Sequence, residues 1–428
     1  MNDARNYDIL LWKNKIWESK VSNSGDLAII RNTFLKLKQH IPNARLHILS
    51  DDPEHVAQQY GVVAHPISIL ANPAQLLALL RRIDLVILGG GTVFQDDYFA
   101  GIIPINLSVP LLAKAFGARL VCNAVGVGSD EELSRLGKML LRLALPQFDS
   151  ISVRDRESEE MVERWTRGSS TAVHLTNDIA VDLPAADFAK LEPALRDEGI
   201  SLDKPTVAIA ARKVFHHEKT WLYFLPSSLR HRLRLQQRES KQRLETFKDT
   251  LASLCDYMIE RYGVQVLFVP FYGSGGGLDS KNEKTPTRMF TSGDNVFARD
   301  VMGRVRASDQ VKVLSRAYTP EELLAIIGRC KAMIGVPYHS VVFASSRNVP
   351  VIGIDYVSKV ARYLRILGLE DFAVEADAPL SAFQSTFDRL WTKRDAIAEQ
   401  LRSKNRELSQ LSEENVRIIR EVLYASHG

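Results

Sequence analysis

The sequence predicts an α/β protein with two Rossmann-like, doubly wound domains and C-terminal helices. Three observations support this prediction. Short β-branched segments alternate with longer helical segments along most of the 428 residues. The composition is 45% apolar and 25% charged, which is ordinary for a globular protein of a length that can build two cores. Residues 183–205 have weak strand character and three prolines, so they are expected to connect the two domains.

The first domain is expected to span residues 1–190. Its helices are expected at positions such as 27–41 and 74–83, where apolar residues recur with helical spacing. Its buried strands are expected at 7–12, 45–50, 84–91, 119–126, 150–155 and 172–178.

The second domain is expected to span residues 191–375, with helices at 241–262 and 320–330. Its strands are expected at 206–212, 264–271, 311–314, 331–339 and 349–356. Residues 376–428 are charged and helical in pattern, and are expected to pack along the domains. Two such sheets that face each other across a cleft form the GT-B architecture, which many sugar-modifying enzymes use.

Several classes of protein are disfavoured by composition. The first residues lack the apolar stretch of a secretory signal, and no apolar run approaches the roughly 20 residues that span a bilayer. The net charge of +4 is too small to argue for nucleic acid. Cys122, Cys255 and Cys330 are widely spaced within or beside apolar segments, which predicts buried thiols in a reducing compartment. We therefore expect a soluble cytoplasmic protein.

Three glycines at 89–91 directly follow the strand expected at 84–91 and precede Asp96 and Asp97. A backbone without Cβ atoms approaches a ligand or an opposing loop closely, which favours a binding role for Gly90 and Gly91. The spacing is not that of the dinucleotide-binding fingerprint, and a tight structural turn is the alternative.

Asn23, Ser24, Gly25 and Asp26 lead directly into an expected helix. These residues either cap the helix or direct backbone N–H groups and the positive end of the helix toward an anion.

Arg154 and Arg212 each follow a predicted strand, one in each domain. Open α/β sheets bind their ligands at the carboxyl ends of the strands, and an arginine fork suits a carboxylate or a phosphate. A surface salt bridge is the alternative for each.

His339 follows a predicted strand through a Gly/Pro turn and precedes a helix expected to open with Ser340. Its ring is expected to project into the interdomain cleft. An imidazole there can donate or accept a proton or neutralise an anion, although a single histidine can also be purely structural.

Taken together, these motifs resemble the polysaccharide pyruvyl transferase family. They are Gly25-Asp26, the GGG segment followed by acidic residues, SVRD at 152–155, ND-A at 177–180, the strand ending in Arg212, and a block from Gly335 to Lys359. That block reads G-x-x-x-H-S, then P-V-I-x-I-x-Y and a lysine. The resemblance runs from about residue 20 to 370.

The resemblance implies transfer of an enolpyruvyl unit from phosphoenolpyruvate to a sugar of a surface-polysaccharide precursor, with formation of a cyclic ketal and release of phosphate. It implies no metal and no cofactor besides this co-substrate. His339 is the expected general acid or phosphate ligand, and Asp96 or Asp97 is the expected base, with Asp97 preferred. The expected substrate-binding residues are Gly25, Asp26, Gly90, Gly91, Arg154, Arg212, Ser340 and Lys359.

One position departs from the family pattern. Family members usually carry arginine two residues before the histidine, whereas this chain has Pro337 there. Arg316, Arg347 or Lys359 would have to replace the missing cation, or the donor differs.

Residues 212–248 contain ten lysines and arginines against three glutamates, interspersed with aromatic residues. This mixture suits an anionic membrane surface or a lipid diphosphate, so the acceptor is expected to be lipid-linked, although a solvated insertion has the same composition. The glycine-rich segment 271–288 lacks the spacing of a nucleotide-hydrolase phosphate loop.

Two other functions remain open. A GT-B glycosyltransferase with a nucleotide-sugar donor would place an acidic residue such as Asp355 or Glu321 against the donor ribose. A non-catalytic family member would bind a polysaccharide precursor or a partner enzyme without turnover.

Overall fold

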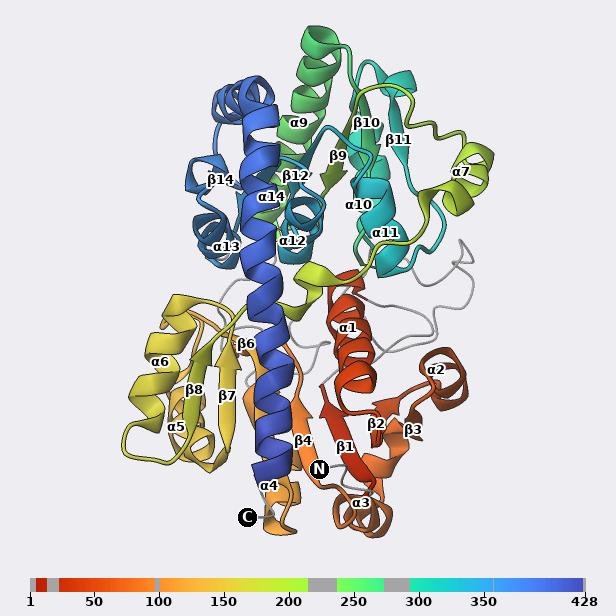
Figure 1. Cartoon of the computed structure of the whole chain (residues 1–428). Coiled ribbons are helices and arrows are strands. Elements are labelled where there is room, and N and C mark those ends of the chain that lie inside the picture. The colour runs from red at the N-terminus through yellow and green to blue at the C-terminus, as the bar shows by residue number, and fades with distance from the viewer. Residues whose placement is uncertain are drawn as a thin grey trace. The chain divides into compact units, whose positions relative to one another are not determined.

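The computed structural model describes residues 5–13, 23–96, 101–214, 237–272, 293–356 and 358–425, with side chains of residues 237–240 excepted. These residues pack into two compact units (Figure 1). Unit 1 comprises Met1–Ser22, Asp26–Leu183 and Glu407–Gly428, and unit 2 comprises Asn23–Gly25 and Pro184–Arg406. The chain passes from unit 1 to unit 2 after Leu183, slightly before the boundary that the sequence suggested at 190.

Unit 1 contains an eight-stranded, wholly parallel sheet in the order β3-β2-β1-β4-β6-β7-β8, and β5 pairs with β6 beside this path. The strands are β1 (Tyr7–Trp12), β2 (Ala44–Ser50), β3 (Val63–Pro66), β4 (Leu85–Leu88), β5 (Gly91–Phe94), β6 (Arg119–Val127), β7 (Ser150–Val153) and β8 (Ala172–Leu175). All six predicted strands are confirmed. The structure adds β3 and β5, and the strand predicted at 84–91 ends at Leu88.

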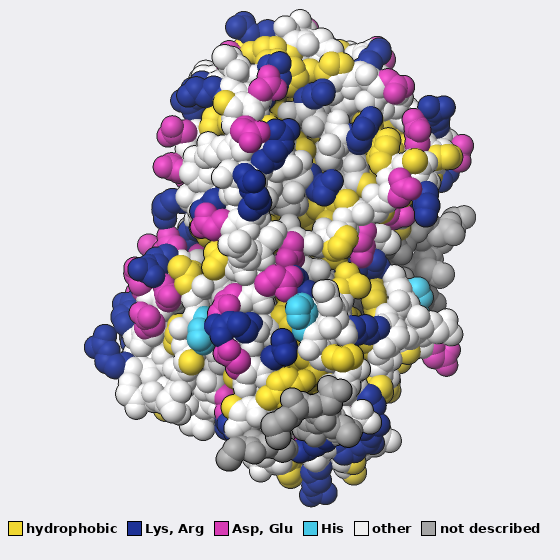
Figure 2. Space-filling model, in the orientation of Figure 1, with side chains coloured by type: hydrophobic (Ala, Val, Ile, Leu, Met, Phe, Trp, Pro, Cys, Tyr) yellow, Lys and Arg dark blue, Asp and Glu magenta, His cyan; other side chains and the backbone are white. Residues whose placement is uncertain are grey.

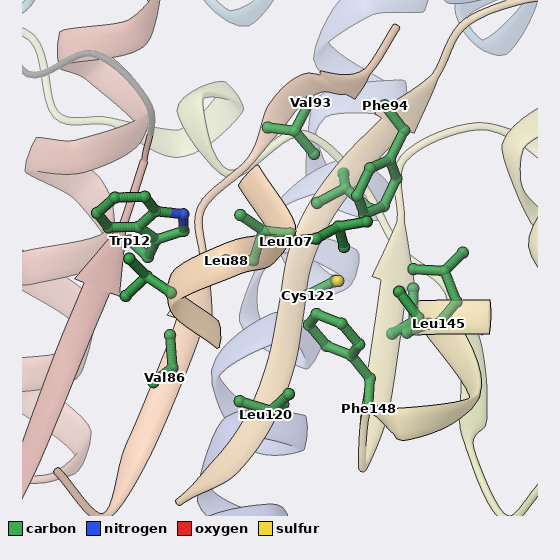
Figure 3. Close-up of a cluster of buried hydrophobic side chains, with 14 of the residues drawn as sticks. Trp12, Val86, Leu88, Val93, Phe94, Leu107, Leu120, Cys122, Leu145 and Phe148 are labelled. Carbon is green, nitrogen blue, oxygen red and sulfur yellow. The ribbon is translucent and has the colours of Figure 1, made fainter. Parts of the chain in front are cut away.

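Helices cover both faces of this sheet, as a doubly wound fold requires. They are α1 (Ser24–His40), α2 (Pro53–Tyr60), α3 (Pro73–Leu80), α4 (Ile102–Ala115), α5 (Arg135–Ala144) and α6 (Arg156–Thr166). One core cluster lies between the sheet and α3 to α6, and Figure 3 shows Trp12, Leu88 and Phe148 within it. The other cluster lies between the sheet, α1, α2 and the last turns of the C-terminal helix.

Unit 2 contains a six-stranded parallel sheet in the order β11-β10-β9-β12-β13-β14. The strands are β9 (Thr206–Ala210), β10 (Gln265–Phe268), β11 (Val311–Val313), β12 (Ala332–Gly335), β13 (Val351–Asp355) and β14 (Ala373–Glu375). The helices are α7 (Phe188–Asp197), α9 (Gln237–Tyr262), α10 (Asp294–Met302), α11 (Pro320–Ile327), α12 (Tyr338–Ser346) and α13 (Lys359–Leu367). The five predicted strands are confirmed, β14 is additional, and the predicted connector contains α7.

The last element is one 45-residue helix, α14 (Leu380–Tyr424). Its residues up to Arg406 belong to unit 2 and those from Glu407 belong to unit 1. Residues 376–428, which the sequence suggested as a separate helical segment, are therefore shared between the two units.

The burial of the cysteines and the mixed charges on the surface agree with the predictions made from the composition. Cys122, Cys255 and Cys330 are free and buried, and burial raises the pKa of the Cys330 thiol to about 12. Figure 2 shows Lys and Arg side chains interspersed with Asp and Glu on the face in view. Within the described residues, no helix combines the length and the apolar character needed to cross a bilayer.

Candidate active site

Each sheet has one place where a ligand site is expected. Open α/β sheets bind ligands at the carboxyl edge, where the strand order reverses. In unit 2 the order reverses between β9 and β12, and in unit 1 it reverses between β1 and β4. Arg212 follows β9 and His339 follows β12, so both lie at the expected edge of unit 2.

His339 lies in the first turn of α12, because the helix begins at Tyr338 and not at Ser340 as the sequence suggested. Pro337 precedes the helix with φ −65° and ψ 134°, and its carbonyl accepts hydrogen bonds from the Ser340 N–H (2.9 Å) and hydroxyl (2.6 Å). The imidazole is buried, with 8% of His339 exposed, and it contacts the Tyr338 ring edge-on at 5.1 Å between centroids. The turn before α12 thus fixes the position of the ring.

Gly25 lies directly against the His339 ring. A Cβ atom at Gly25 would lie 2.1 Å from His339 Nδ1, so only glycine fits this position. The segment is held at the end of β10, where the Ser24 N–H donates to the Phe271 carbonyl (2.9 Å) and Asn23 forms a bridge with Tyr272. The structure therefore makes Gly25 a close neighbour of the imidazole.

Ser340 is engaged within its own helix. Its side chain is fully buried, its hydroxyl donates to Pro337, and a Cβ at Gly335 would lie 2.4 Å from its Oγ. In this arrangement Ser340 supports the turn that carries His339.

Arg212 is held by an acidic and two aromatic side chains. Its Nε lies 3.6 Å from Asp294 Oδ1, its guanidinium lies 5.7 Å from the centre of the Tyr272 ring, and it hydrogen-bonds to Tyr356. Burial by itself lowers the pKa of Arg212, but Asp294 and Tyr356 outweigh it and the pKa is raised. Because 23% of the side chain is exposed, this cation remains accessible to an anionic ligand.

Asp294 balances the charge of Arg212 and joins α10 to β10. Its carboxylate accepts a hydrogen bond from the Phe271 N–H (3.0 Å), and its own N–H donates to the Tyr272 carbonyl (3.1 Å). Burial raises the pKa of Asp294, and Arg212 opposes this shift.

Lys359 supplies a second cation at the same edge. It is the first residue of α13, and its Nζ lies 5.9 Å from the centre of the Tyr356 ring, which Arg212 also contacts. The other two candidates for the missing family arginine lie elsewhere: Arg316 pairs with Asp197 and Glu198, and Arg347 lies at the C-terminal end of α12. Of the three, Lys359 lies at the edge of the sheet that also carries Arg212.

In unit 1, the glycine segment lies beside an ion pair. A Cβ at Gly90 would lie 2.9 Å from the Asn123 carbonyl oxygen, and Gly91 has φ 96°, which favours glycine. At the start of α1, Asn23 Oδ1 accepts a hydrogen bond from the Gly25 N–H (3.1 Å), and Asp26 in the first turn pairs with Lys13 at 2.8 Å. A Cβ at Gly91 would lie 3.6 Å from the Lys13 ammonium, so the ion pair borders the glycines.

Arg154 lies in the interior of unit 1. It pairs with Asp178 at 2.8 Å and donates to the Thr92 hydroxyl at 2.8 Å, and only 4% of it is exposed. A Cβ at Gly126 would lie 2.9 Å from its Nε, so the guanidinium crosses the backbone of β6. Arg154 does form an ion pair, which was one of the two alternatives for this residue, but the pair is buried inside unit 1 and does not lie at the surface.

Asp96 is bonded to a helix terminus, whereas several other predicted features lie outside the described residues. Asp96 accepts hydrogen bonds from the N–H (2.7 Å) and the hydroxyl of Ser134 at the start of α5, so this carboxylate supports a helix terminus. Asp97, most of the basic segment (215–236) and most of the glycine-rich segment (273–288) lie outside the described residues. Within the described residues, no group of three or more His, Cys, Asp and Glu side chains is placed to hold a metal ion.

Sequence reasoning missed Lys13, Tyr272 and Asp294 as site residues. Lys13 directly follows β1, so its place at the strand's carboxyl end was a usable signal. Tyr272 and Asp294 flank the segment 273–292, and nothing in the linear pattern indicates that they meet Arg212. Tyr356 lies in the block from Gly335 to Lys359 that resembles the family, but the linear sequence does not indicate that it contacts Arg212.

Several solved structures share this fold at low sequence identity. UDP-GlcNAc 2-epimerase from Methanocaldococcus jannaschii is 10% identical, with a TM-score of 0.58 over 91% of this chain and 93% of that one. Sucrose-phosphate synthase from Thermosynechococcus elongatus is 14% identical, with a TM-score of 0.55 over 99% and 100%. Anabaena HepE, solved in complex with UDP and glucose, is 12% identical, with a TM-score of 0.55 over 97% and 100%. The predicted GT-B-like fold class is therefore confirmed.

The family follows from the sequence itself. The model of the polysaccharide pyruvyl transferase family matches residues 23–358, which include Gly25, the glycine segment, Arg154, Arg212 and the block from Gly335 to Ser358. This range agrees with the extent of the resemblance inferred from the motifs. The chain belongs to the polysaccharide pyruvyl transferase family of transferases.

Proposed function

We propose that this protein transfers a pyruvyl group from phosphoenolpyruvate to a sugar of a surface-polysaccharide precursor, in the cytoplasm, and forms a ketal. The observation that carries the proposal is the edge of unit 2, where Arg212 and Lys359 both contact Tyr356 and the imidazole of His339 follows the adjacent strand β12. Two cations suit the carboxylate and the phosphate of this donor.

The chemistry assigns a role to His339. In the proposed reaction, a sugar hydroxyl attacks C2 of phosphoenolpyruvate while an acid protonates the C3 methylene, and the hydroxyl proton passes to a base. Loss of inorganic phosphate and attack by a second hydroxyl at C2, whose proton passes to the released phosphate, then close the ketal. We assign the protonation of C3 to His339, because the α12 turn holds this ring in a fixed position.

The remaining residues of the site position these groups. Asp294 and Tyr356 orient Arg212, Gly25 leaves room for the imidazole, and Ser340 holds the turn that carries it. Asp97 stays the proposed base for the sugar hydroxyl, on the basis of its place after the glycine segment alone.

The test is phosphate release by the purified protein with phosphoenolpyruvate and a panel of lipid-linked sugars. We expect phosphate to appear together with a pyruvyl-modified acceptor, and His339→Asn to lower the rate by about 100-fold or more. The matched control is His55→Asn on the exposed face of α2, which should keep the full rate. Failure of the wild type to turn over or bind the donor across a broad panel would refute the proposal.

A nucleotide-sugar glycosyltransferase is the second candidate, because Anabaena HepE shares the fold in complex with UDP and glucose. Asp355 and Glu321, the acidic residues predicted to contact the ribose of such a donor, are less suited to that role. Asp355 is buried and accepts a long hydrogen bond from the Ala361 N–H (3.4 Å), whereas Glu321 lies in the first turn of α11. A thermal shift with UDP sugars but not with phosphoenolpyruvate would favour this candidate.

A non-catalytic role makes a different prediction. If the protein only binds a precursor or a partner enzyme, His339→Ala leaves its biological role intact. Loss of polymer modification in a folded His339→Ala variant would exclude a pure scaffold.

A further inference from the structure

Helix α5 presents a row of large apolar side chains to solvent. Leu136, Met139 and Leu143 are 52%, 50% and 66% exposed. Their spacing of three and four residues places them along one stripe of the helix. The opposite side of α5, with Gly137, Leu141 and Ala144, is buried against unit 1. A helix that is apolar on both sides is normally covered on both sides.

The neighbouring helix extends this apolar surface. Helices α4 and α5 are in contact, and both bury their inner faces in the same core cluster. On α4, Ile105 and Leu112 are 40% and 37% exposed, and Phe116, which directly follows the helix, is 37% exposed, at a spacing of seven and four residues along one side. Both outer faces therefore point away from the sheet and offer apolar side chains to solvent.

The charges along α5 are of one sign. Arg135, Lys138 and Arg142 form a second row beside the apolar one, and the helix has no acidic residue. Lys138 pairs with Asp130 at 3.1 Å, and Arg135 and Arg142 are exposed to solvent. The nearest acidic residues in the sequence, 130–132, precede the helix at its N-terminal end.

We propose that the outer face of α5, extended by α4, docks the protein onto an anionic phospholipid surface. An amphipathic helix that lies in the headgroup region buries its leucines and directs its arginines to lipid phosphates. A second copy of this chain fits less well, because a symmetric contact brings the same face of two molecules together and opposes like charges. The inference concerns a surface and does not depend on which donor the enzyme uses.

The test is co-sedimentation of the full chain with vesicles of phosphatidylcholine, with and without phosphatidylglycerol. We expect the wild type to sediment only with the anionic vesicles and to be released by salt. The double variants Leu136→Ser/Leu143→Ser and Arg135→Gln/Arg142→Gln should each lower the partition coefficient by about tenfold or more. The matched control is Val296→Ser on α10, which removes a side chain that is 59% exposed in unit 2 and should bind like the wild type.

The vesicle assay and the phosphate-release assay test the docking surface and the proposed reaction separately. The proposal is overturned if the wild type does not bind anionic vesicles, if the Leu136→Ser/Leu143→Ser variant binds as well as the wild type, or if light scattering shows that α5 mediates a dimer in solution. Thermal unfolding of each variant establishes that it is folded. Phosphate release with a water-soluble acceptor should be unchanged in all α5 variants, and its absence from the wild type would refute the proposed reaction without affecting the vesicle result.

Discussion

At the scale of single residues, Gly25 shows how closely the chain is fitted around His339. Alanine normally favours a helix over glycine by about 1 kcal/mol, so Gly25→Ala in α1 would otherwise stabilise. Here the added methyl would lie 2.1 Å from His339 Nδ1, so the imidazole or the segment 23–25 must move. We expect Gly25→Ala to lower kcat by about tenfold or more, because a displaced acid transfers its proton less efficiently.

Gly303→Ala is the matched control for this variant. A Cβ at Gly303 would meet the Arg299 carbonyl at 3.5 Å, which is an ordinary contact. Steady-state kinetics of the two variants measure the effect. If Gly25→Ala keeps the wild-type kcat, the contact with His339 has no part in turnover.

Arg212 tests whether geometry or charge alone holds the donor. Arg212→Lys keeps a positive charge but loses the planar fork that reaches Asp294 and Tyr356. We expect the KM for phosphoenolpyruvate to rise by about tenfold in Arg212→Lys and further in Arg212→Met, with Arg316→Met as a control because that arginine pairs with Asp197 and Glu198. Equal KM values in all four proteins would show that Arg212 does not hold the donor.

At the scale of elements, a buried amide on α14 bonds this helix to β7 and β8 of unit 1. Asn415 Oδ1 accepts from the hydroxyls of Ser152 (2.7 Å) and Thr176 (2.8 Å), and its Nδ2 donates to the Asn177 carbonyl (3.0 Å). These partners lie on or directly after β7 and β8, and Asn415 is 1% exposed.

Asn415→Ala should therefore lower the free energy of unfolding by about 2–4 kcal/mol, since it removes three hydrogen bonds and leaves buried partners unsatisfied. Chemical denaturation measures the change. Arg420→Ala, at an exposed position of the same helix, should stay within about 0.5 kcal/mol of the wild type. A similar small change for Asn415→Ala would mean that water replaces the amide at no cost.

Buried, mostly apolar strands are the elements that the sequence predicts best. The strands β1, β4, β6, β9 and β13 are buried over nearly their whole length and are mostly apolar, so they stand out against their helices. Three strands escaped prediction: β3 is a half-exposed four-residue edge strand, β14 has three residues, and β5 begins at the glycine that also ends the GGG segment. Short or exposed strands carry little hydrophobic signal, and their pairing partners decide them.

The sequence predicts some residues of the candidate site and misses others. His339, Arg212 and Lys359 were found because they directly follow strands or belong to the quoted block. Arg154 also follows a strand, but whether such a side chain turns inward depends on a partner far along the chain, in this case Asp178. Asp294 was missed for the same reason, since its meeting with Arg212 depends on the packing of α10 against β10.

At the scale of the whole molecule, a pair of histidines, His47 buried and His65 half-buried, makes stability depend on pH. His47 Nε2 lies 2.7 Å from Asp8 Oδ1, and its Nδ1 lies 3.0 Å from His65 Nε2 with the two rings stacked. Burial lowers the pKa of both histidines below 6.5; Asp8 opposes this shift at His47, whereas Arg82 adds to it at both.

The unfolded chain therefore binds more protons than the folded one as the pH falls through 6.5. The stability contributed by the neutral pair is complete above this pH and is lost progressively below it. We expect the free energy of unfolding to fall between about pH 7.5 and 5.5, and His47→Gln/His65→Gln to flatten this dependence relative to the exposed His55→Gln. An unchanged slope in the double variant would assign the effect to other groups.

Isothermal titration calorimetry of the wild type and of Arg212→Met, with phosphoenolpyruvate and with UDP-glucose, measures whether the cationic edge of unit 2 binds a small donor that carries a carboxylate and a phosphate. We expect phosphoenolpyruvate to bind the wild type, to bind Arg212→Met with lower affinity, and to bind the wild type more tightly than UDP-glucose does. Tight binding of UDP-glucose to the wild type, without binding of phosphoenolpyruvate, would contradict this expectation.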